Sequence, residues 1–359
     1  MKIAVDAMGA DYGPGPVIEG VVMALSDYPE CEFVLVGHSG KLPFYLEKYG
    51  IAGHPRISVV HAETVCEMSE PSTTSLRAKK NCSITVCARL LKEKAVDAMV
   101  TPGHTGATVA ATKVLVRTLP GVDRPALAAS LPTQNGKRFL LVDAGANIEC
   151  TPVNIVQFAI LGEVYAQYLF RLDSPRVSLL SVGGEDIKGN DLTKESFKLL
   201  GKRSQLNFVG NVEANVIFEN VADVLIADGF SGNVMLKGVE GLAKSVMFWL
   251  KRVLSKNALR MTGAMLAKNA FIELKSFGDA DDIGGAPLLG LNGICIIGHG
   301  SSSPKAVRSA IRVACECVEF GLNDRIAARI NETGSNTAEL EEELAEEKKQ
   351  RPGGSSAGR

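Results

Sequence analysis

The chain has few aromatic residues, almost no net charge and no long apolar run. Aromatic side chains make up 6% of its 359 residues, and the formal net charge is −1. Proteins that bind nucleic acids use stacked aromatic side chains and an excess of positive charge. No apolar segment reaches the roughly 20 residues that span a bilayer. The composition therefore argues against nucleic-acid binding and against a membrane-spanning protein.

Several signature motifs are also missing. No predicted strand is followed by GxGxxG, and neither GxxxxGK[ST] nor GxSxG occurs, so nucleotide binding and a serine nucleophile lack their usual support. The eight cysteines form no CxxC pair and no cluster with histidine at zinc spacing. We therefore expect no metal and no cofactor, and we expect the cysteines to be small buried side chains in a reducing cytoplasm. The first residues, MKIAVDAMGA, lack the apolar stretch of a signal peptide.

Short apolar runs alternate with longer segments of helical periodicity. Strands are predicted at Lys2–Ala7, Glu32–Gly37, Ile57–His61, Ala98–Thr101, Ala126–Ser130, Phe139–Asp143, Val177–Val182, Asn207–Val209, Val224–Ala227 and Ile294–Gly298. Helices are predicted at Val17–Leu25, Thr73–Lys92, Gly106–Leu119, Val153–Phe170, Leu192–Lys202 and Lys305–Ile330. The alternation predicts an α/β fold with a mainly parallel sheet and helices on both faces. Residues 1–331 form one predicted domain, and 332–359 have too few apolar groups to be more than a disordered tail with a transient helix.

Glycine-rich turns follow many of the predicted strands. They are DAMGAD at 6–11, TPGHTG at 101–106, GGEDIKGN at 183–190, DGFSGN at 228–233 and GHG at 298–300. Glycine lets a ligand approach the backbone closely, and ligands of parallel sheets bind beyond the carboxyl ends of the strands. We therefore expect these turns to converge on one site.

Polar residues in these turns are candidates for binding an anion. Lys188, with Asn190 beside it, could place a positive charge on the anion, although a solvated surface lysine remains the alternative. Asn233 could cap a helix that starts near it, or its amide could donate to an oxyanion. His104 and His299 could serve acid–base chemistry or anion binding, or could be structural histidines.

The segment Lys251–Lys275 carries six basic residues and one acidic residue. Leu254, Ala258, Met261 and Met265 follow helical spacing in it. A basic amphipathic helix can lie on an anionic membrane or receive an acidic partner, or it can pack its apolar face on its own core. Gly263 is predicted to divide the segment into a protruding helical hairpin.

Taken in order, the motifs resemble one known family. DAMGAD, TPGHTGAT, LLVDAGANIECTP, VGGEDIKGN, NFVGNVE, DGFSGNVMLKGVEG and DDIGGAPLLGLNGICIIGHGSS are similar to the bacterial phosphate acyltransferases of phospholipid synthesis, the PlsX family, from residue 1 to about residue 325. The resemblance implies a three-layer α/β/α fold, related to phosphotransacetylases and to isocitrate and isopropylmalate dehydrogenases, with an amphipathic hairpin at about 240–275. It also implies a cytoplasmic homodimer in peripheral contact with the membrane.

The resemblance further implies an activity. The enzyme would transfer a long-chain acyl group from acyl carrier protein to inorganic phosphate. The acyl phosphate would then reach a glycerol-3-phosphate acyltransferase for phosphatidic acid synthesis. Lys188 and Asn233 are the implied catalytic residues. The implied substrate-binding residues are His104, Thr105, Gly106, Asn190, Asp228, Gly285 and His299. The implied contacts with membrane or carrier protein are Leu254, Ala258, Arg260, Met261, Met265 and Lys268.

Two positions depart from the family pattern, which usually has asparagine in place of His104 and commonly glycine in place of Ala10. Three other functions stay open. A phosphotransacylase would use coenzyme A thioesters and would have no evident purpose for a basic hairpin. A decarboxylating dehydrogenase would need a nicotinamide site and a metal, which only the acidic run Asp279, Asp281 and Asp282 suggests. A non-catalytic membrane scaffold would need neither Lys188 nor Asn233.

Overall fold

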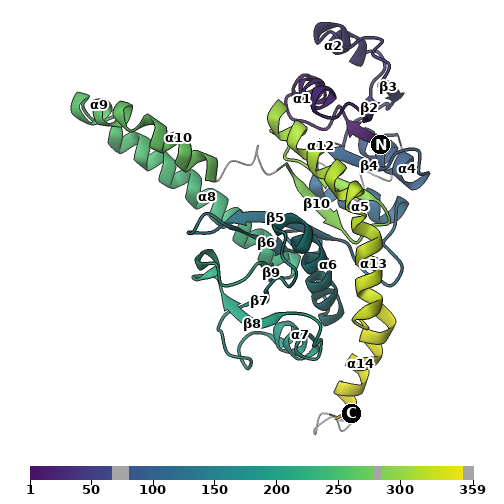
Figure 1. Ribbon diagram of the computed structural model, residues 1–359, viewed down its shortest axis with the longest axis vertical. Coiled ribbons are helices and arrows are strands. Elements are labelled where there is room, and N and C mark those ends of the chain that lie inside the picture. The colour runs from purple at the N-terminus through teal and green to yellow at the C-terminus, as the bar shows by residue number, and fades with distance from the viewer. Residues whose placement is uncertain (67–80, 278–283, 351–359) are drawn as a thin grey trace, which may run out of the picture.

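The computed structural model describes residues 1–66, 81–277 and 284–350. One large sheet runs through this part of the chain, in the order β3-β2-β1-β4-β11-β10-β5-β6-β9-β7-β8 (Figure 1). The strands are β1 (Lys2–Asp6), β2 (Glu32–Gly37), β3 (Ile57–His61), β4 (Ala98–Thr101), β5 (Ala126–Pro132), β6 (Arg138–Val142), β7 (Val177–Ser181), β8 (Phe208–Glu213), β9 (Val224–Ile226), β10 (Ala286–Leu289) and β11 (Ile294–Ile297).

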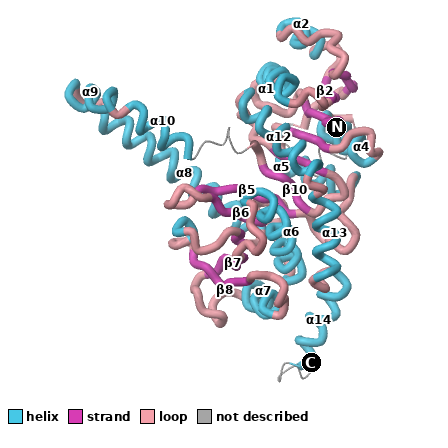
Figure 2. The backbone as a smooth tube through the Cα atoms, in the orientation of Figure 1, coloured by secondary structure: helices cyan, strands magenta, loops and turns pink. Residues whose placement is uncertain are grey.

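Helices cover both faces of the sheet, as Figure 2 shows. They are α1 (Pro14–Asp27), α2 (Leu42–Lys48), α4 (Ser83–Lys92), α5 (Thr105–Leu115), α6 (Pro152–Phe170), α7 (Asp191–Gly201), the 3-10 helix η1 (Ile217–Glu219), α8 (Gly229–Leu254), α9 (Ala258–Leu266), α10 (Lys268–Phe277), α12 (Pro304–Glu319), α13 (Leu322–Glu332) and α14 (Thr337–Gln350). One buried cluster joins the sheet to α1, α6 and α12, and a second joins its other face to α4. These two cores confirm the three-layer α/β/α prediction.

The sheet reverses direction in its middle. Strands β1 to β4 and β11 are parallel to one another, but β10 is antiparallel to both β11 and β5, and β5 is antiparallel to β6. Strands β6, β9, β7 and β8 then form a second parallel block. The sheet is therefore mainly parallel, as predicted, but its two blocks run in opposite directions. Strand β10 was not predicted, because Pro287 and the glycines on either side are typical of a turn.

A helical hairpin protrudes from the body (Figure 1). Helix α8 runs outward, and α9 and α10 run back along it. The turn lies at residues 255–257, where Asn257 Oδ1 accepts a hydrogen bond from the Arg260 N–H at 2.9 Å and so begins α9. The predicted division at Gly263 is wrong, because that glycine lies inside α9 and the capping side chain sets the break instead. No helix in the described part of the chain has the length and apolar character needed to cross a membrane.

The structure differs from the expected disordered tail over residues 337–350. Helix α14 packs on the body through Leu340, which is fully buried. Glu343 accepts a hydrogen bond from Arg203 at 2.5 Å, and Lys202 pairs with Glu347. The acidic residues of α14 therefore have basic partners just after α7. The expected tail beyond residue 350 lies outside the described residues.

Candidate active site in two parts

The predicted site residues separate into two groups at opposite ends of the strands. The first loop group follows β1, β4 and β11 and contains His104, Thr105, Gly106 and His299, with Gly285 beside it. The second loop group follows β6, β7 and β9 and contains Lys188, Asn190, Asp228 and Asn233. Because the two parallel blocks run in opposite directions, their carboxyl ends face opposite ways. The expectation that all glycine-rich turns converge on one site within the chain is therefore wrong.

A buried carboxylate organises the first loop group. Asp6, at the end of β1, has no exposed surface, and its Oδ1 accepts hydrogen bonds from the backbone N–H groups of Met8 and Gly9, both at 3.0 Å. Its Oδ2 accepts from the Thr101 hydroxyl at 2.9 Å, at the end of β4. Burial raises the pKa of Asp6, and these hydrogen bonds act against that rise. The carboxylate therefore ties two neighbouring turns together.

Two helices begin in the first loop group. His104 caps α5 because its Nδ1 accepts a hydrogen bond from the Ala107 N–H at 3.2 Å, and Ser303 caps α12 in the same way through Ala306. The amino ends of helices favour anions, since their N–H groups are unpaired and the helix dipole is positive there. His299, which is exposed, has its Nδ1 2.8 Å from the Ser301 hydroxyl. The arrangement suits a phosphate, and it gives His104 a structural role as well.

Gly285 lies at the boundary between this group and the sheet. Its φ of +83° is a conformation that side chains disfavour. A Cβ at this position would lie 2.9 Å from the Ile297 carbonyl oxygen at the end of β11. Only glycine fits here, so the backbone of residue 285 adjoins the first loop group.

A second buried carboxylate, Asp143, organises the second loop group. It follows β6 and accepts five hydrogen bonds from N–H groups, at 2.7 to 3.1 Å. The donors are the backbone N–H groups of Leu127, Gly145, Ala146 and Asn147 and the Asn147 side-chain amide. Burial raises the pKa of Asp143, and the N–H donors oppose this effect. The sequence analysis missed both Asp6 and Asp143, although each ends an apolar strand and precedes a glycine by two or three residues.

Helix α8 begins directly against this loop. Asp228 Oδ1 accepts from the Ser231 N–H at 2.9 Å, so Asp228 is the helix cap, and the structure excludes the cap as one of the two alternatives for Asn233. A Cβ on Gly232 would lie 2.0 Å from the Asp143 carbonyl oxygen. The exposed Asn233 lies next to Gly145, whose added Cβ would be 3.2 Å from its Cβ. The Asn233 Oδ1 atom would lie 3.4 Å from the same added Cβ, so this side chain lies beside the Asp143 loop.

Lys188 lies in the neighbouring loop. Strand β7 pairs with β9, so the loop after β7 lies beside the start of α8. The Lys188 stem folds over Gly183, with its Cγ 2.7 Å from an added Cβ, and the side chain is exposed. Its ammonium forms no ion pair with the residues that the structure describes. Asn190 Oδ1 accepts from the Thr193 N–H at 2.9 Å and caps α7. The segments after β6, β7 and β9 also expose apolar side chains, at Ile148, Val182, Ile187, Phe230 and Val234.

Hairpin residues that were predicted to contact membrane or carrier protein are separate from both loop groups. Leu254, Met261 and Met265 line an apolar groove of about 600 Å³ between the hairpin helices. Ala258 and Lys268 are exposed, and Arg260 Nη1 donates to the Val253 carbonyl at 3.3 Å. The hairpin also exposes large apolar side chains on its outer surface, among them Trp249, Leu259 and Leu266.

Most of the cysteines are buried, as predicted, and Cys150 is half-buried. The Cys66 thiol donates to Cys82 Sγ at 3.0 Å, which lowers the pKa of Cys82 to about 6.

Among the described residues no group of three His, Cys, Asp or Glu side chains is placed to hold a metal ion. The acidic run at Asp279, Asp281 and Asp282 lies outside the described residues.

Solved structures define the class of fold. A phosphotransacetylase from Streptococcus pyogenes matches with a TM-score of 0.55 and 18% identity, covering 92% of this chain and 94% of that one. The EutD phosphotransacetylase from Staphylococcus aureus also matches with a TM-score of 0.55, at 15% identity. It covers 89% of this chain and 94% of that one. The chain therefore has the α/β/α fold of the phosphotransacetylases.

Sequence relatives define the family. The model of the fatty acid synthesis protein family matches residues 1–325. The phosphate acyltransferase of Thermodesulfovibrio yellowstonii is 45% identical over 334 residues, which is 93% of this chain and 95% of that relative. The phosphate acyltransferase of Bacillus pumilus is 42% identical over 336 residues, covering 94% of this chain and 99% of the relative. This chain belongs to the phosphate acyltransferase family, and it is an acyltransferase of lipid synthesis.

The contact between Gly232 and the Asp143 loop gives a testable prediction. Gly232→Ala should destabilise the protein by about 1 to 3 kcal/mol, because the added methyl group forces α8 away from the loop. Gly241→Ala on the same helix meets open space and should be neutral or stabilising by up to about 1 kcal/mol. Thermal and urea unfolding would measure both. Equal stability of the two variants would contradict the close packing.

Proposed function

We propose that this protein transfers a long-chain fatty acyl group from acyl carrier protein to inorganic phosphate, forming acyl phosphate. The acyl phosphate would pass to a glycerol-3-phosphate acyltransferase for phosphatidic acid synthesis. The observation that carries the proposal is the location of Lys188 and Asn233 in the segments that follow the neighbouring strands β7 and β9, which also expose large apolar side chains. The fold and the names of the relatives support a transfer to phosphate.

The chemistry needs few protein groups. Phosphate is itself a nucleophile at neutral pH, so the protein has only to hold it against the thioester carbonyl and stabilise the oxyanion that forms. The Lys188 ammonium would bind phosphate and the charge of the transition state, and the Asn233 amide would donate to the carbonyl oxygen. The amino ends of α5 and α12, with His104, Thr105, Gly106 and His299 near them, would supply further donors to phosphate.

The exposed apolar side chains in the segments after β6, β7 and β9 favour a long acyl chain, because each buried methylene group contributes about 0.8 kcal/mol. The basic residues of the hairpin, including Arg260 and Lys268, favour an acidic carrier protein over coenzyme A as the acyl donor.

The reaction is tested by release of free carrier protein from palmitoyl-acyl carrier protein, with and without phosphate and with hydroxylamine to trap acyl phosphate. Turnover of palmitoyl-coenzyme A alone would identify a phosphotransacylase instead.

Removal of either proposed catalytic side chain should slow the reaction. Lys188→Ala and Asn233→Ala should each lower kcat/KM about a hundredfold or more, because one oxyanion donor lowers the activation free energy by roughly 3 kcal/mol. Lys198→Ala, which removes an exposed lysine from α7, should leave kcat/KM unchanged. Near wild-type turnover by a folded Lys188→Ala variant would overturn the assignment.

A homodimer would bring the two loop groups together. Within one chain the groups face opposite ways, so the anion-binding helix ends of one copy would meet Lys188 and Asn233 of a second copy. The exposed apolar side chains of α8, among them Leu242, Val246 and Trp249, support an interface between copies, since such a surface is costly in water.

A shared site predicts complementation between inactive variants. Thr105→Glu should repel phosphate from the first loop group, and Lys188→Ala should disable the second. Coexpression of these two variants should restore part of the activity, because a mixed dimer holds one site with both groups intact. Lys188→Ala coexpressed with Asn233→Ala should restore none, because both changes fall in the same group. Failure of the first pair to recover would place the whole site in one chain.

The hairpin also supports peripheral membrane contact, since Leu259 and Leu266 are more than four-fifths exposed beside basic residues. Leu259→Asp with Leu266→Asp should abolish cosedimentation with vesicles of phosphatidylcholine and phosphatidylglycerol. Thr262→Asp with Asn269→Asp adds the same charge at exposed polar positions of the hairpin and should retain most of the binding. Loss of binding in both pairs would show that charge alone, rather than apolar insertion, holds the protein on the vesicle.

A further inference from the structure

Two cysteines that the proposed acyl transfer does not use lie in contact beside α5. The Cys66 thiol donates to Cys82 Sγ at 3.0 Å. Cys82 has no exposed surface, and Cys66 is 4% exposed. The two side chains share a small buried cluster with Ile84 of α4 and with Ala107 and Ala111 of α5. Because the amino end of α5 belongs to the first loop group, the cysteine pair lies close to that group.

The backbone holds the two cysteines together. Thr64 and Cys82 form a parallel bridge, in which the Ser83 N–H donates to the Thr64 carbonyl at 3.1 Å. The Glu63 N–H donates to the Asn81 carbonyl at the same distance. The sulfur atoms of a disulfide are about 2.05 Å apart, so the two Sγ atoms would have to approach by only about 1 Å. A bond between them therefore needs no separation or rearrangement of the two segments.

The two thiols differ in reactivity. The hydrogen bond from Cys66 lowers the pKa of Cys82 to about 6, against the effect of burial. The Thr85 hydroxyl, 2.9 Å from Cys82 Sγ, acts in the same direction as Cys66. The thiolate is the form of cysteine that reacts with oxidants. Cys82 is therefore the nucleophile of the pair at neutral pH, and Cys66 lies in contact with it as the second thiol that a disulfide needs.

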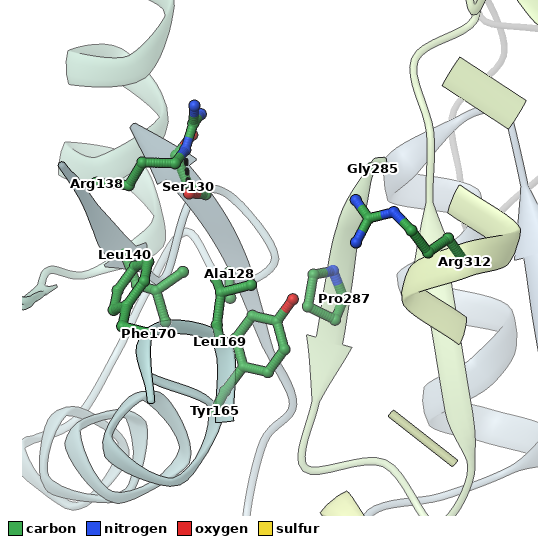
Figure 3. A pocket seen from close by; sticks show the side chains of 10 residues that line it. All are labelled: Ala128, Ser130, Arg138, Leu140, Tyr165, Leu169, Phe170, Gly285, Pro287 and Arg312. Atoms are coloured by element: carbon green, nitrogen blue, oxygen red, sulfur yellow. Dashed lines mark hydrogen bonds between the residues drawn. The ribbon is translucent and has the colours of Figure 1, made fainter. Parts of the chain in front are cut away.

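A second pair of cysteines provides an internal comparison. Cys31 Sγ and Cys315 Sγ are 3.6 Å apart, and both side chains are buried. Burial, together with the neighbouring Cys31, raises the pKa of Cys315, so this thiol stays protonated. Helix α12, which carries Cys315, also borders a cavity of about 210 Å³ through Arg312 (Figure 3). None of the ten side chains that line this cavity is a cysteine, so a small oxidant in it would not contact the second pair.

We propose that Cys66 and Cys82 are a modification site, at which hydrogen peroxide converts the two thiols into a reversible disulfide. The Cys82 thiolate attacks one peroxide oxygen and becomes a sulfenic acid, and the hydroxide that leaves takes up a proton. Cys66 then loses its proton and attacks the Cys82 sulfur, so that the S–S bond forms, the S–O bond breaks and water leaves. Two thiols lose two electrons and two protons in total, and one peroxide is reduced to two molecules of water.

The burial of the pair determines which oxidant can act. Since almost no surface of either cysteine is exposed, the site admits a small oxidant such as peroxide and excludes the disulfide of a partner protein. The new bond would join the segment after β3 to the start of α4, beside α5. In a reducing cytoplasm such a bond would be transient, as is typical of redox-sensing cysteines.

Peptide mapping tests the proposal. The full-length protein is reduced, freed of reductant, treated with hydrogen peroxide, quenched with catalase, alkylated in urea and cut with trypsin. The expected product is a disulfide between peptides 57–77 and 81–89, which dithiothreitol separates. A link between Cys31 and Cys315 should form at least tenfold more slowly, because Cys315 is not ionised. Absence of the first link, or equal rates for the two pairs, would overturn the proposal.

Variants assign the roles of the two sulfur atoms. Cys87 shares a tryptic peptide with Cys82, so Cys87→Ala is the matched control and should keep the link that Cys82→Ala loses. Cys66→Ser retains a hydroxyl donor for Cys82 but cannot form the bond, so a sulfenic acid should accumulate on Cys82. Dimedone added with urea would trap it. Cys66→Ala removes the donor and should slow the oxidation of Cys82 about tenfold.

Two outcomes with these variants would contradict the assignment. One is a link that survives in Cys82→Ala and disappears in Cys87→Ala. The other is the absence of a sulfenic acid on Cys82 in a Cys66→Ser variant whose melting temperature shows that it is folded. Every readout is a covalent change at a cysteine, so failure here would leave the acyl-transfer assay unaffected, and the converse also holds.

Discussion

The antiparallel strand pairing in the middle of the sheet determines where the candidate site residues lie. Strand β10 pairs antiparallel with both β11 and β5, and β5 with β6, so the second parallel block runs against the first. Since ligands of parallel sheets bind beyond the carboxyl ends of the strands, one chain has two candidate half-sites that face apart. The helix ends suited to phosphate belong to one half, and Lys188 and Asn233 belong to the other. Each half contains a buried aspartate at the end of a strand.

A buried carboxylate stabilises the loop conformation in each half-site. Asp6 and Asp143 end buried strands and turn their carboxylates onto the N–H groups of the loop that follows. A buried charge without partners would be costly, so these carboxylates and their loops stabilise each other. The glycines near them serve close packing, since Gly232 admits the Asp143 carbonyl against α8 and Gly145 admits Asn233. The glycine-rich turns thus have as much to do with packing backbone against backbone as with admitting a ligand.

The sequence predicted the regular elements well where their patterns were local. Strands β2, β3 and β4 begin and end at the predicted residues, because apolar runs bounded by turn residues need no distant partner to be recognised. Strand β10 was missed, because a proline and flanking glycines hide a strand whose place is set only by its neighbours. The predicted helix Lys305–Ile330 is interrupted at Gly321, whose φ of +66° ends the α-helical path.

The sequence by itself determined the fold class, the family and the identity of most polar residues in the loops, because these depend on local periodicity and on motifs read in order. It could not determine which of those residues share a site. That depends on the direction of each strand within the sheet, which is set by hydrogen bonds between segments more than a hundred residues apart, such as β10 and β5. Tertiary structure alone placed Lys188 away from His104, because strand direction is a property of the assembled chain.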